Sequence, residues 1–309
     1  MRLAVTLGDP RGIGPEIVGA VRADPACARL ATLTLVGPSG TSVPVDVVVG
    51  EWTPGGSPAH AGQLAGRAIE RAVELALSGA VDGIVTAPID KAALFAGGYD
   101  FPGHTEMLAA LTHSSVAMML ASSGSADGTR HPLRVVLATT HVPLRDVVTS
   151  VTREAIAAAA AVTRRGLVEW FGVDAPRIAL CALNPHAGDG GRFGTEDDTV
   201  LAPAARSVGI AGPYPADTVF VRALRGEFDA VIAPYHDVGM TAIKVAAFGS
   251  AVNVTLGLPF PRTSPDHGTA LDIAGRGLAD ASSMKESVRV CAAIVTRLQQ
   301  RTASGIANR

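Results

Sequence analysis

The amino-acid sequence predicts an α/β protein in which helices cover both faces of a parallel β-sheet. Short apolar segments alternate with amphipathic helical patterns along the chain, which is typical of repeated strand–helix–strand units. The chain has 309 residues, and 48% of them are hydrophobic, so it can bury a sizeable core. This length exceeds the usual limit for one hydrophobic core. We therefore expect two lobes or one large α/β unit.

Seven apolar segments are the predicted strands. They cover residues 2–7, 32–37, 81–88, 134–140, 177–183, 229–234 and 251–256. In the fourth of these, Val135 and Val136 are β-branched residues that favour a buried strand. His141 follows this strand directly, at the kind of position where α/β proteins present functional side chains on loops.

Two segments carry the clearest helical patterns. Residues 62–77 place apolar side chains on one face, with Arg67 and Glu70 opposite, so this helix packs one side on the sheet. The C-terminal stretch from Met284 to Leu298 has the same spacing. Segments 50–62 and 121–132 are rich in Gly, Ser and Pro and are predicted loops, the second being a surface hairpin or a disordered insert.

Composition excludes several classes of function. The net charge is −2 and no long basic run occurs, so nucleic acid is not an expected partner. The longest apolar run, residues 155–162, is far shorter than the roughly 20 residues that span a bilayer, so we expect no membrane segment. Cys27, Cys181 and Cys291 form no Cys-x-x-Cys pair, which is typical of small core residues in a reducing cytoplasm.

Polar, glycine-containing segments follow most of the predicted strands. They are residues 8–17, 86–108, 139–146, 183–197, 233–244 and 253–270, and we expect them to form loops. In the first, Gly12 and Gly14 permit close backbone approach, and exposed N–H groups there could hold an anion. The dinucleotide fingerprint G-x-G-x-x-G is absent, because Ile17 occupies its third glycine position. A nicotinamide cofactor would therefore bind by a scheme other than the Rossmann one.

Five of the eight histidines lie in these predicted loops. They are His104, His141, His186, His236 and His267. One such histidine alone is more often a hydrogen-bonded structural residue, but five together favour a metal or acid–base site. Their spacing is too wide for a local zinc finger, so any metal must be bound by loops that the fold brings together. Three imidazoles with open coordination positions would be a catalytic metal site.

Two cations in these segments are suited to an anionic substrate. Arg262 offers a planar fork for phosphate or carboxylate, and Lys244 offers a point charge. Glu106, Asp146 and Asp237 could orient the histidines, although solvated loop carboxylates or helix caps are an equal alternative.

Several of these motifs occur together in one known family. The segments GDPRGIGPEI, GHTE, ATTHVPLRD, LNPHAGDGG, GPYPADT, YHD, NVTLGLPF and RTSPDHGTALDIAGRG resemble the 4-hydroxythreonine-4-phosphate dehydrogenase family of vitamin B6 synthesis. The resemblance runs in order along nearly the whole chain. Two positions depart from the family pattern, since Arg11 replaces a small residue and Val238 replaces a glutamine.

The resemblance implies a fold like that of the isocitrate and isopropylmalate dehydrogenases. Residues 1–309 would form one family unit of two α/β lobes with a cleft between them, and two chains would form a homodimer. In the family, the matching histidines bind one divalent metal, either zinc, magnesium or cobalt; here they are His141, His186 and His236. The residues that match the family's substrate contacts are His104, Thr105, Lys244, Asn253 and Arg262.

The resemblance also implies an activity. We expect oxidation of 4-phosphooxy-L-threonine by NAD or NADP to the 3-oxo acid, followed by decarboxylation to 3-amino-2-oxopropyl phosphate. Lys244 and Asp237 are candidates for the group that takes the alcohol proton. Relatives in the family act instead on 4-phosphothreonate or 4-phosphoerythronate, or on a dihydrodiol dicarboxylate. A metal-dependent hydrolase and a non-catalytic protein that binds a phosphorylated metabolite are the alternatives of other classes.

Overall fold

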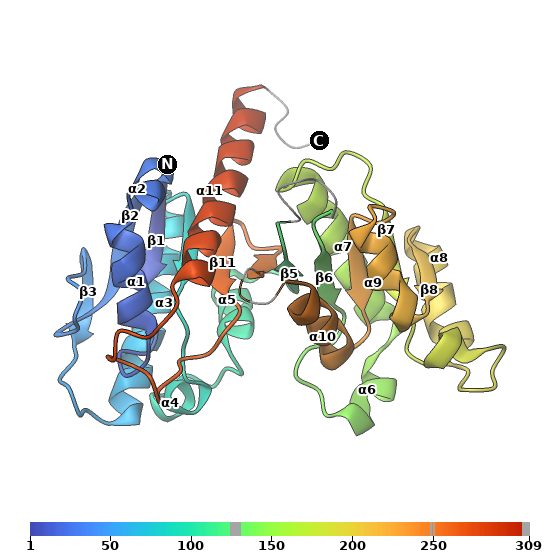
Figure 1. The fold of residues 1–309 in the computed structure, drawn as a ribbon, viewed down its shortest axis with the longest axis horizontal. Coiled ribbons are helices and arrows are strands. Elements are labelled where there is room, and N and C mark those ends of the chain that lie inside the picture. Colours follow the sequence, from blue (N-terminus) through green and yellow to red (C-terminus); the bar gives the residue numbers. More distant parts are fainter. Residues whose placement is uncertain (124–130, 248, 250, 305–309) are drawn as a thin grey trace. The chain divides into compact units, whose positions relative to one another are not determined.

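The computed structural model describes residues 1–123, 131–247, 249 and 251–304, and the chain divides into two compact units (Figure 1). Unit 1 comprises Met1–Ser114 and Val252–Arg309, and unit 2 comprises Ser115–Ala251. The chain thus leaves unit 1, builds unit 2 and returns, so the blue and red ends of the ribbon belong to the same unit.

Unit 1 is built on six strands of mostly parallel direction. Their spatial order is β3 (Val47–Glu51), β2 (Thr32–Ser39), β1 (Arg2–Thr6), β4 (Gly83–Thr86), β11 (Arg262–Pro265) and β10 (Val252–Leu256). All neighbouring pairs are parallel except β10 and β11, which are antiparallel. Strands β10 and β11 belong to the part of the chain that follows unit 2.

Helices cover both faces of the unit 1 sheet. On one face α1 (Gly14–Ala23), α2 (Pro25–Leu30) and α11 (Ser282–Ala303) enclose the main core with Leu3, Val5 and Val85 of the strands. On the other face α3 (Pro58–Leu77) packs along β1 to β4, and α4 (Lys91–Ala96) and α5 (His104–Thr112) pack against α3. The helical pattern predicted for residues 62–77 is confirmed, and the helix begins earlier, at Pro58, because Ser57 caps it by accepting a hydrogen bond from His60 N.

Unit 2 has its own strands, in the order β5 (Ala117–Ala121), β6 (Arg134–Leu137), β9 (Ala230–Ala233), β7 (Ile178–Cys181) and β8 (Ala211–Tyr214). Helices α9 (Ala216–Leu224) and α10 (His236–Ala247) share one apolar core with these strands. Helices α7 (Arg153–Glu169) and α8 (Ala202–Val208) pack together and contact other parts of the sheet. The short α6 (Leu144–Ser150) and single turns at Pro185–Gly188 and Asp197–Leu201 complete the unit.

The predicted α/β class and all seven predicted strands are confirmed, but two details differ. The sheet is mixed, because β10–β11 and β5–β6 are antiparallel. The strands β3, β5, β8 and β11 were not predicted. The three cysteines are buried core residues, as expected. Residues 124–130 of the predicted loop 121–132 lie outside the described residues. In the described part of the chain, no helix combines the length and apolar character needed to cross a bilayer.

Candidate functional site

A row of polar side chains crosses the middle of the unit 1 sheet. Thr263 of β11 bonds to the carbonyl of Ser287 in α11, so its strand neighbours on either side face away from α11. The register pairs Thr6 with Thr86 and Asn253 with Ser264, which places both pairs in phase with this opposite face. The row consists of Thr6, Thr86, Arg262, Ser264, Asn253 and Thr255.

Arg262 lies at the centre of this row. The sequence analysis expected it in a loop, and this was wrong: it begins β11 and only 1% of its surface is exposed. Its Nη1 donates to Thr255 Oγ1 at 2.9 Å, and its Nη2 donates to Thr86 Oγ1 at 2.5 Å. Its Nε is buried without a hydrogen-bond partner among the described residues. Burial lowers the pKa of this guanidinium, because a low-polarity surrounding disfavours a cation.

His104 and Thr105 open helix α5, which the sequence analysis had placed within a long loop. His104 as a residue is partly exposed, but its Nε2 atom is buried and has no partner among the described residues. Burial is the main cause that holds the pKa of His104 well below its usual value, and the charges of Arg262 and Lys91 act in the same direction. Asn253 likewise has a buried Oδ1 with no partner in the described chain.

Unit 1 therefore holds a cation and several buried polar atoms that have no hydrogen-bond partner in the described part of the chain. Buried polar atoms are nearly always hydrogen-bonded, so a cluster of exceptions indicates a ligand. Arg262 Nε can donate, Asn253 Oδ1 can accept, and the neutral ring of His104 can do either at Nε2. This set fits an anionic ligand that also carries hydroxyl or amino groups. Four of the five predicted substrate residues, all but Lys244, belong to this unit.

In unit 2, two of the three predicted metal ligands lie together. The ring centroids of His141 and His236 are 5.6 Å apart. His236 is the first residue of α10, and its Nδ1 lies 2.7 Å from Asp237 Oδ1. A carboxylate on one ring nitrogen fixes the imidazole and leaves the other nitrogen to bind a metal.

Helix α10 also carries the fifth predicted substrate residue. Lys244 follows His236 by about two helical turns, so the two side chains share one face. This face borders a hollow of about 650 Å³ that is also lined by Met240 and Thr241. The sequence analysis placed Lys244 in a loop, and this was wrong because the segment after the YHD motif is helical.

The third predicted metal ligand, His186, lies on an exposed loop beside Phe193, with ring centroids 6.2 Å apart. Its φ of 54° is left-handed, and the Asp197 carboxylate anchors the start of the loop by accepting bonds from Leu183 N and Asn184 N. No group of three or more potential ligands suited to a metal occurs among the described residues of one chain. The single chain thus brings His141 and His236 together and leaves His186 outside the pair. His267 is exposed and its Nδ1 lies 3.1 Å from Gly268 O.

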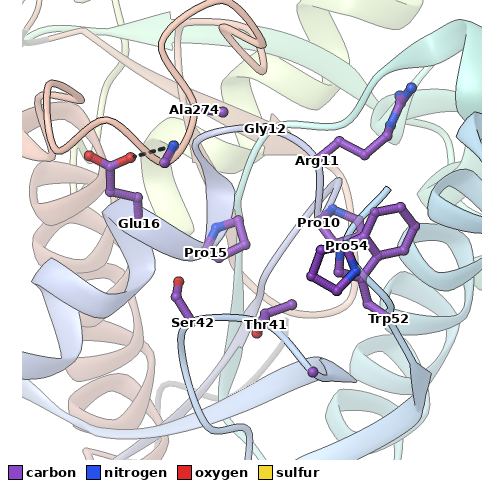
Figure 2. Close-up of a pocket in the computed structure, with 12 residues that line it drawn as sticks. Pro10, Arg11, Gly12, Pro15, Glu16, Thr41, Ser42, Trp52, Pro54 and Ala274 are labelled. Atoms are coloured by element: carbon purple, nitrogen blue, oxygen red, sulfur yellow. Dashed lines mark hydrogen bonds between the residues drawn. The ribbon is translucent and has the colours of Figure 1, made fainter. Parts of the chain in front are cut away.

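Unit 1 also has a hollow, of about 250 Å³, which lies beside the loop between β1 and α1 (Figure 2). Close packing of Gly12 against Thr269 shapes the loop, since a Cβ at Gly12 would lie 2.7 Å from Thr269 O. Trp52 and Pro54 form one wall (Figure 2). The Glu16 carboxylate accepts bonds from Gly275 N at 3.2 Å and Ala279 N at 3.3 Å.

Arg11, the departure from the family pattern, lines the same hollow. Its guanidinium pairs with Asp9 at 2.6 Å and lies 3.5 Å from Asp90. The Asp9 carboxylate is the main cause that raises the pKa of Arg11 further.

The sequence analysis missed the roles of Thr86, Thr255 and Glu16. The signal for the threonines was available, because each is a polar residue within a mostly apolar strand, at Gly83–Thr86 and Val252–Leu256. Their shared face could not be predicted, because it depends on the order and register of strands that are distant in the chain.

The pKa of His104 predicts a pH dependence of stability. Its folded pKa lies below the unfolded value near 6.5, so below that pH only the unfolded chain takes up the proton and stability falls. Between pH 7.0 and 5.5 the wild type should lose about 1 kcal/mol more than His104→Gln in urea denaturation. His60→Gln, on an exposed position of α3, should keep the wild-type slope. Equal losses in all three proteins would contradict the burial of a neutral imidazole.

Comparisons with known proteins agree on one family. Residues 21–291 match the family described as pyridoxal phosphate biosynthetic protein PdxA. The chain is 41% identical to a 4-hydroxythreonine-4-phosphate dehydrogenase of Burkholderia vietnamiensis over 98% of both chains. A solved 4-hydroxythreonine-4-phosphate dehydrogenase from Klebsiella pneumoniae gives a TM-score of 0.80 at 38% identity, over 95% of this chain and 99% of that one. A terephthalate 1,2-cis-dihydrodiol dehydrogenase from Burkholderia xenovorans gives 0.63 at 26% identity, over 95% and 98%. The chain therefore belongs to the PdxA family of pyridoxal phosphate biosynthetic proteins.

Proposed function

We propose that this protein is a dehydrogenase that oxidises 4-phosphooxy-L-threonine at its secondary alcohol and then releases carbon dioxide, leaving 3-amino-2-oxopropyl phosphate. The observation that carries the proposal is the buried polar cluster of unit 1, where Arg262, His104 and Asn253 present unpartnered atoms. A substrate with phosphate, carboxylate, amino and hydroxyl groups has the partners that this cluster lacks. The relatives that cover 98% of the chain and bear this enzyme name support the same reaction.

The reaction places definite demands on side chains. In the oxidation, the alcohol carbon loses a hydride to the nicotinamide and the hydroxyl loses a proton. In the decarboxylation, the bond between the carboxylate and its neighbouring carbon breaks, carbon dioxide leaves, and that carbon takes up a proton. Asp237 Oδ1 accepts a hydrogen bond from His236 Nδ1, so this carboxylate is suited to orienting the imidazole. Lys244 shares the helix face of His236, and we infer that it is the better of the two candidates for moving the proton.

A divalent metal, zinc, magnesium or cobalt, fits the imidazole pair of unit 2 in part. His141 and His236 supply two nitrogen ligands, and the Asp237 carboxylate orients the His236 ring through a hydrogen bond at Nδ1. When bound, the metal would withdraw charge from the substrate oxygen, while a nicotinamide would accept the hydride. Because His186 lies outside the pair in one chain, we infer a homodimer in which it completes the metal site of the other subunit.

The hollow of Figure 2 is suited to part of a nicotinamide cofactor. Trp52 and Pro54 offer a flat apolar wall, and the loop that holds Gly12 lets a ligand approach the backbone. Arg11 and Glu16 are the charged residues that line the hollow, and Asp9 and Asp90 lie against the Arg11 guanidinium. Carboxylates therefore outnumber guanidinium groups in and directly beside the hollow. A 2′-phosphate would meet this negative charge, so we propose NAD rather than NADP. The cysteine usage supports a cytoplasmic enzyme.

The substrate proposal predicts dependence on the phosphate group. Removing it should lower kcat/KM by at least about 100-fold, equivalent to roughly 2.7 kcal/mol, because charge-assisted bonds to Arg262 are lost. Initial rates of NADH formation at 340 nm with the phosphorylated compound and its dephosphorylated form measure this. The likeness to a dihydrodiol dehydrogenase favours a second candidate, a phosphate-free dicarboxylate. Full-rate oxidation of such a diol would establish that candidate instead, and 4-phosphoerythronate in the same assay tests the amino group.

The cofactor proposal predicts a preference for NAD over NADP of at least about tenfold in kcat/KM, or about 1.4 kcal/mol. The reason is repulsion between the 2′-phosphate and the carboxylates around the hollow. Glu16→Gln should reduce the preference for NAD over NADP, because it removes one negative charge and keeps an oxygen that accepts hydrogen bonds. Equal use of both cofactors by the wild type would contradict this placement.

The shared metal site predicts complementation between inactive variants. His141→Ala and His186→Ala should each be inactive as homodimers, because each lacks one imidazole at every site. Mixing them by denaturation and refolding should restore about a quarter of the wild-type activity, since half of the dimers are mixed and each has one intact site. His186→Ala mixed with His186→Ala is the control. No recovery in the mixture would place all three ligands in one chain.

A further inference from the structure

The guanidinium of Arg262 is a buried cation whose charge is offset only in part and through space, by the Glu106 carboxylate among others. Its only hydrogen-bond partners among the described residues are the hydroxyls of Thr86 and Thr255, which are neutral. Within the same residues it forms no ion pair with a carboxylate. Fully buried charges in proteins are normally paired, because removing a charge from water is expensive.

The identity of these two partners is informative. A carboxylate at either position would accept two N–H groups and cancel the charge, and the arginine would then be a structural ion pair. A threonine hydroxyl accepts one N–H, fixes the plane of the guanidinium and leaves its charge intact. Nε has no hydrogen-bond partner among the residues that the structure describes, so the group is held in place and still has an N–H donor and a positive charge available for a ligand.

The strands make this arrangement rigid. Arg262 stands on β11, and its two partners stand on the strands at either side, Thr86 on β4 and Thr255 on β10. The sheet register therefore sets the distance between the two hydroxyls, and a β-branched side chain has few rotamers with which to move them. The orientation of the guanidinium is thus determined before any ligand arrives.

We propose that Thr86 and Thr255 are positioning residues that aim the guanidinium of Arg262 at the phosphate of the substrate without neutralising it. The identity of the substrate rests on the proposed function, but the affinity of this site for a phosphate dianion does not. Neither hydroxyl touches the substrate in this arrangement, and both act through Arg262. Burial lowers the pKa of Arg262, and the Glu106 carboxylate offsets this only in part, which is consistent with a charge that an anionic ligand would complete.

The test compares variants that remove or keep each hydroxyl. Thr86→Val and Thr255→Val preserve the shape and delete the acceptor, whereas Thr86→Ser and Thr255→Ser keep it. Titration calorimetry with inorganic phosphate at pH 8, without cofactor, should show about tenfold weaker binding by each valine variant, equivalent to about 1.4 kcal/mol. The serine variants should bind within about threefold of the wild type.

Thr263→Val is the matched control. It deletes a buried threonine hydroxyl from the same strand, but on the face that bonds to Ser287 O of α11. It should lower the unfolding temperature as the other valine variants do and leave phosphate affinity unchanged. In turnover, Thr86→Val and Thr255→Val should raise KM for the phosphorylated substrate more than they lower kcat.

Two results would overturn the proposal. One is a wild type that binds no phosphate at 10 mM, and the other is a set of valine variants that bind it as the wild type does. Equal weakening by the serine and valine variants would also overturn it, since the hydroxyl would then be irrelevant. The proposed function is tested separately. If the valine and serine variants bind phosphate as predicted but no phosphorylated hydroxy acid yields NADH, the positioning role is supported and the proposed function is refuted.

Discussion

The structure of unit 1 depends on how a sheet accommodates a charge in its interior. Strands β1, β4 and β10 consist mostly of apolar residues that favour burial, yet one face of the sheet carries the Arg262 guanidinium and five other polar side chains. Such a face is unfavourable for folding, because each polar atom must be desolvated. The opposite face compensates, since Leu3, Val5 and Val85 pack with α1 and α11 into a continuous apolar core. Stability and ligand binding are thus assigned to opposite faces of the same strands.

Most of the fold, and the residue types of the candidate site, could be predicted from the sequence. Strands with dense β-branched residues, such as those at Arg2–Thr6 and Ala230–Ala233, could be predicted because their pattern is local. The strand Arg262–Pro265 was missed because it is short and contains Arg, Ser and Pro, and only its neighbours in space make it a strand. The chemical types of the site residues were informative, whereas their secondary structure was not.

The histidines show where the limit lies. Imidazoles far apart in the sequence predicted a site assembled by folding, and His141 and His236 do lie together. The position of His186 depends on a loop whose left-handed residues include three non-glycines, His186, Ala187 and Asp189, and no periodic pattern encodes such a conformation. Interactions between subunits are also absent from a local pattern, because an interface residue looks like any surface residue.

The interrupted path of the chain has a consequence for biosynthesis. Unit 2 occupies one continuous stretch, Ser115–Ala251, so it can fold as soon as that stretch has left the ribosome. Unit 1 cannot, because β4 has no neighbour on its inner side until β11 is synthesised. During this interval an apolar strand edge is exposed, and such an edge is a template for pairing with other chains. The last strand to arrive brings Arg262, so the cation enters the sheet in the same step that closes the exposed edge.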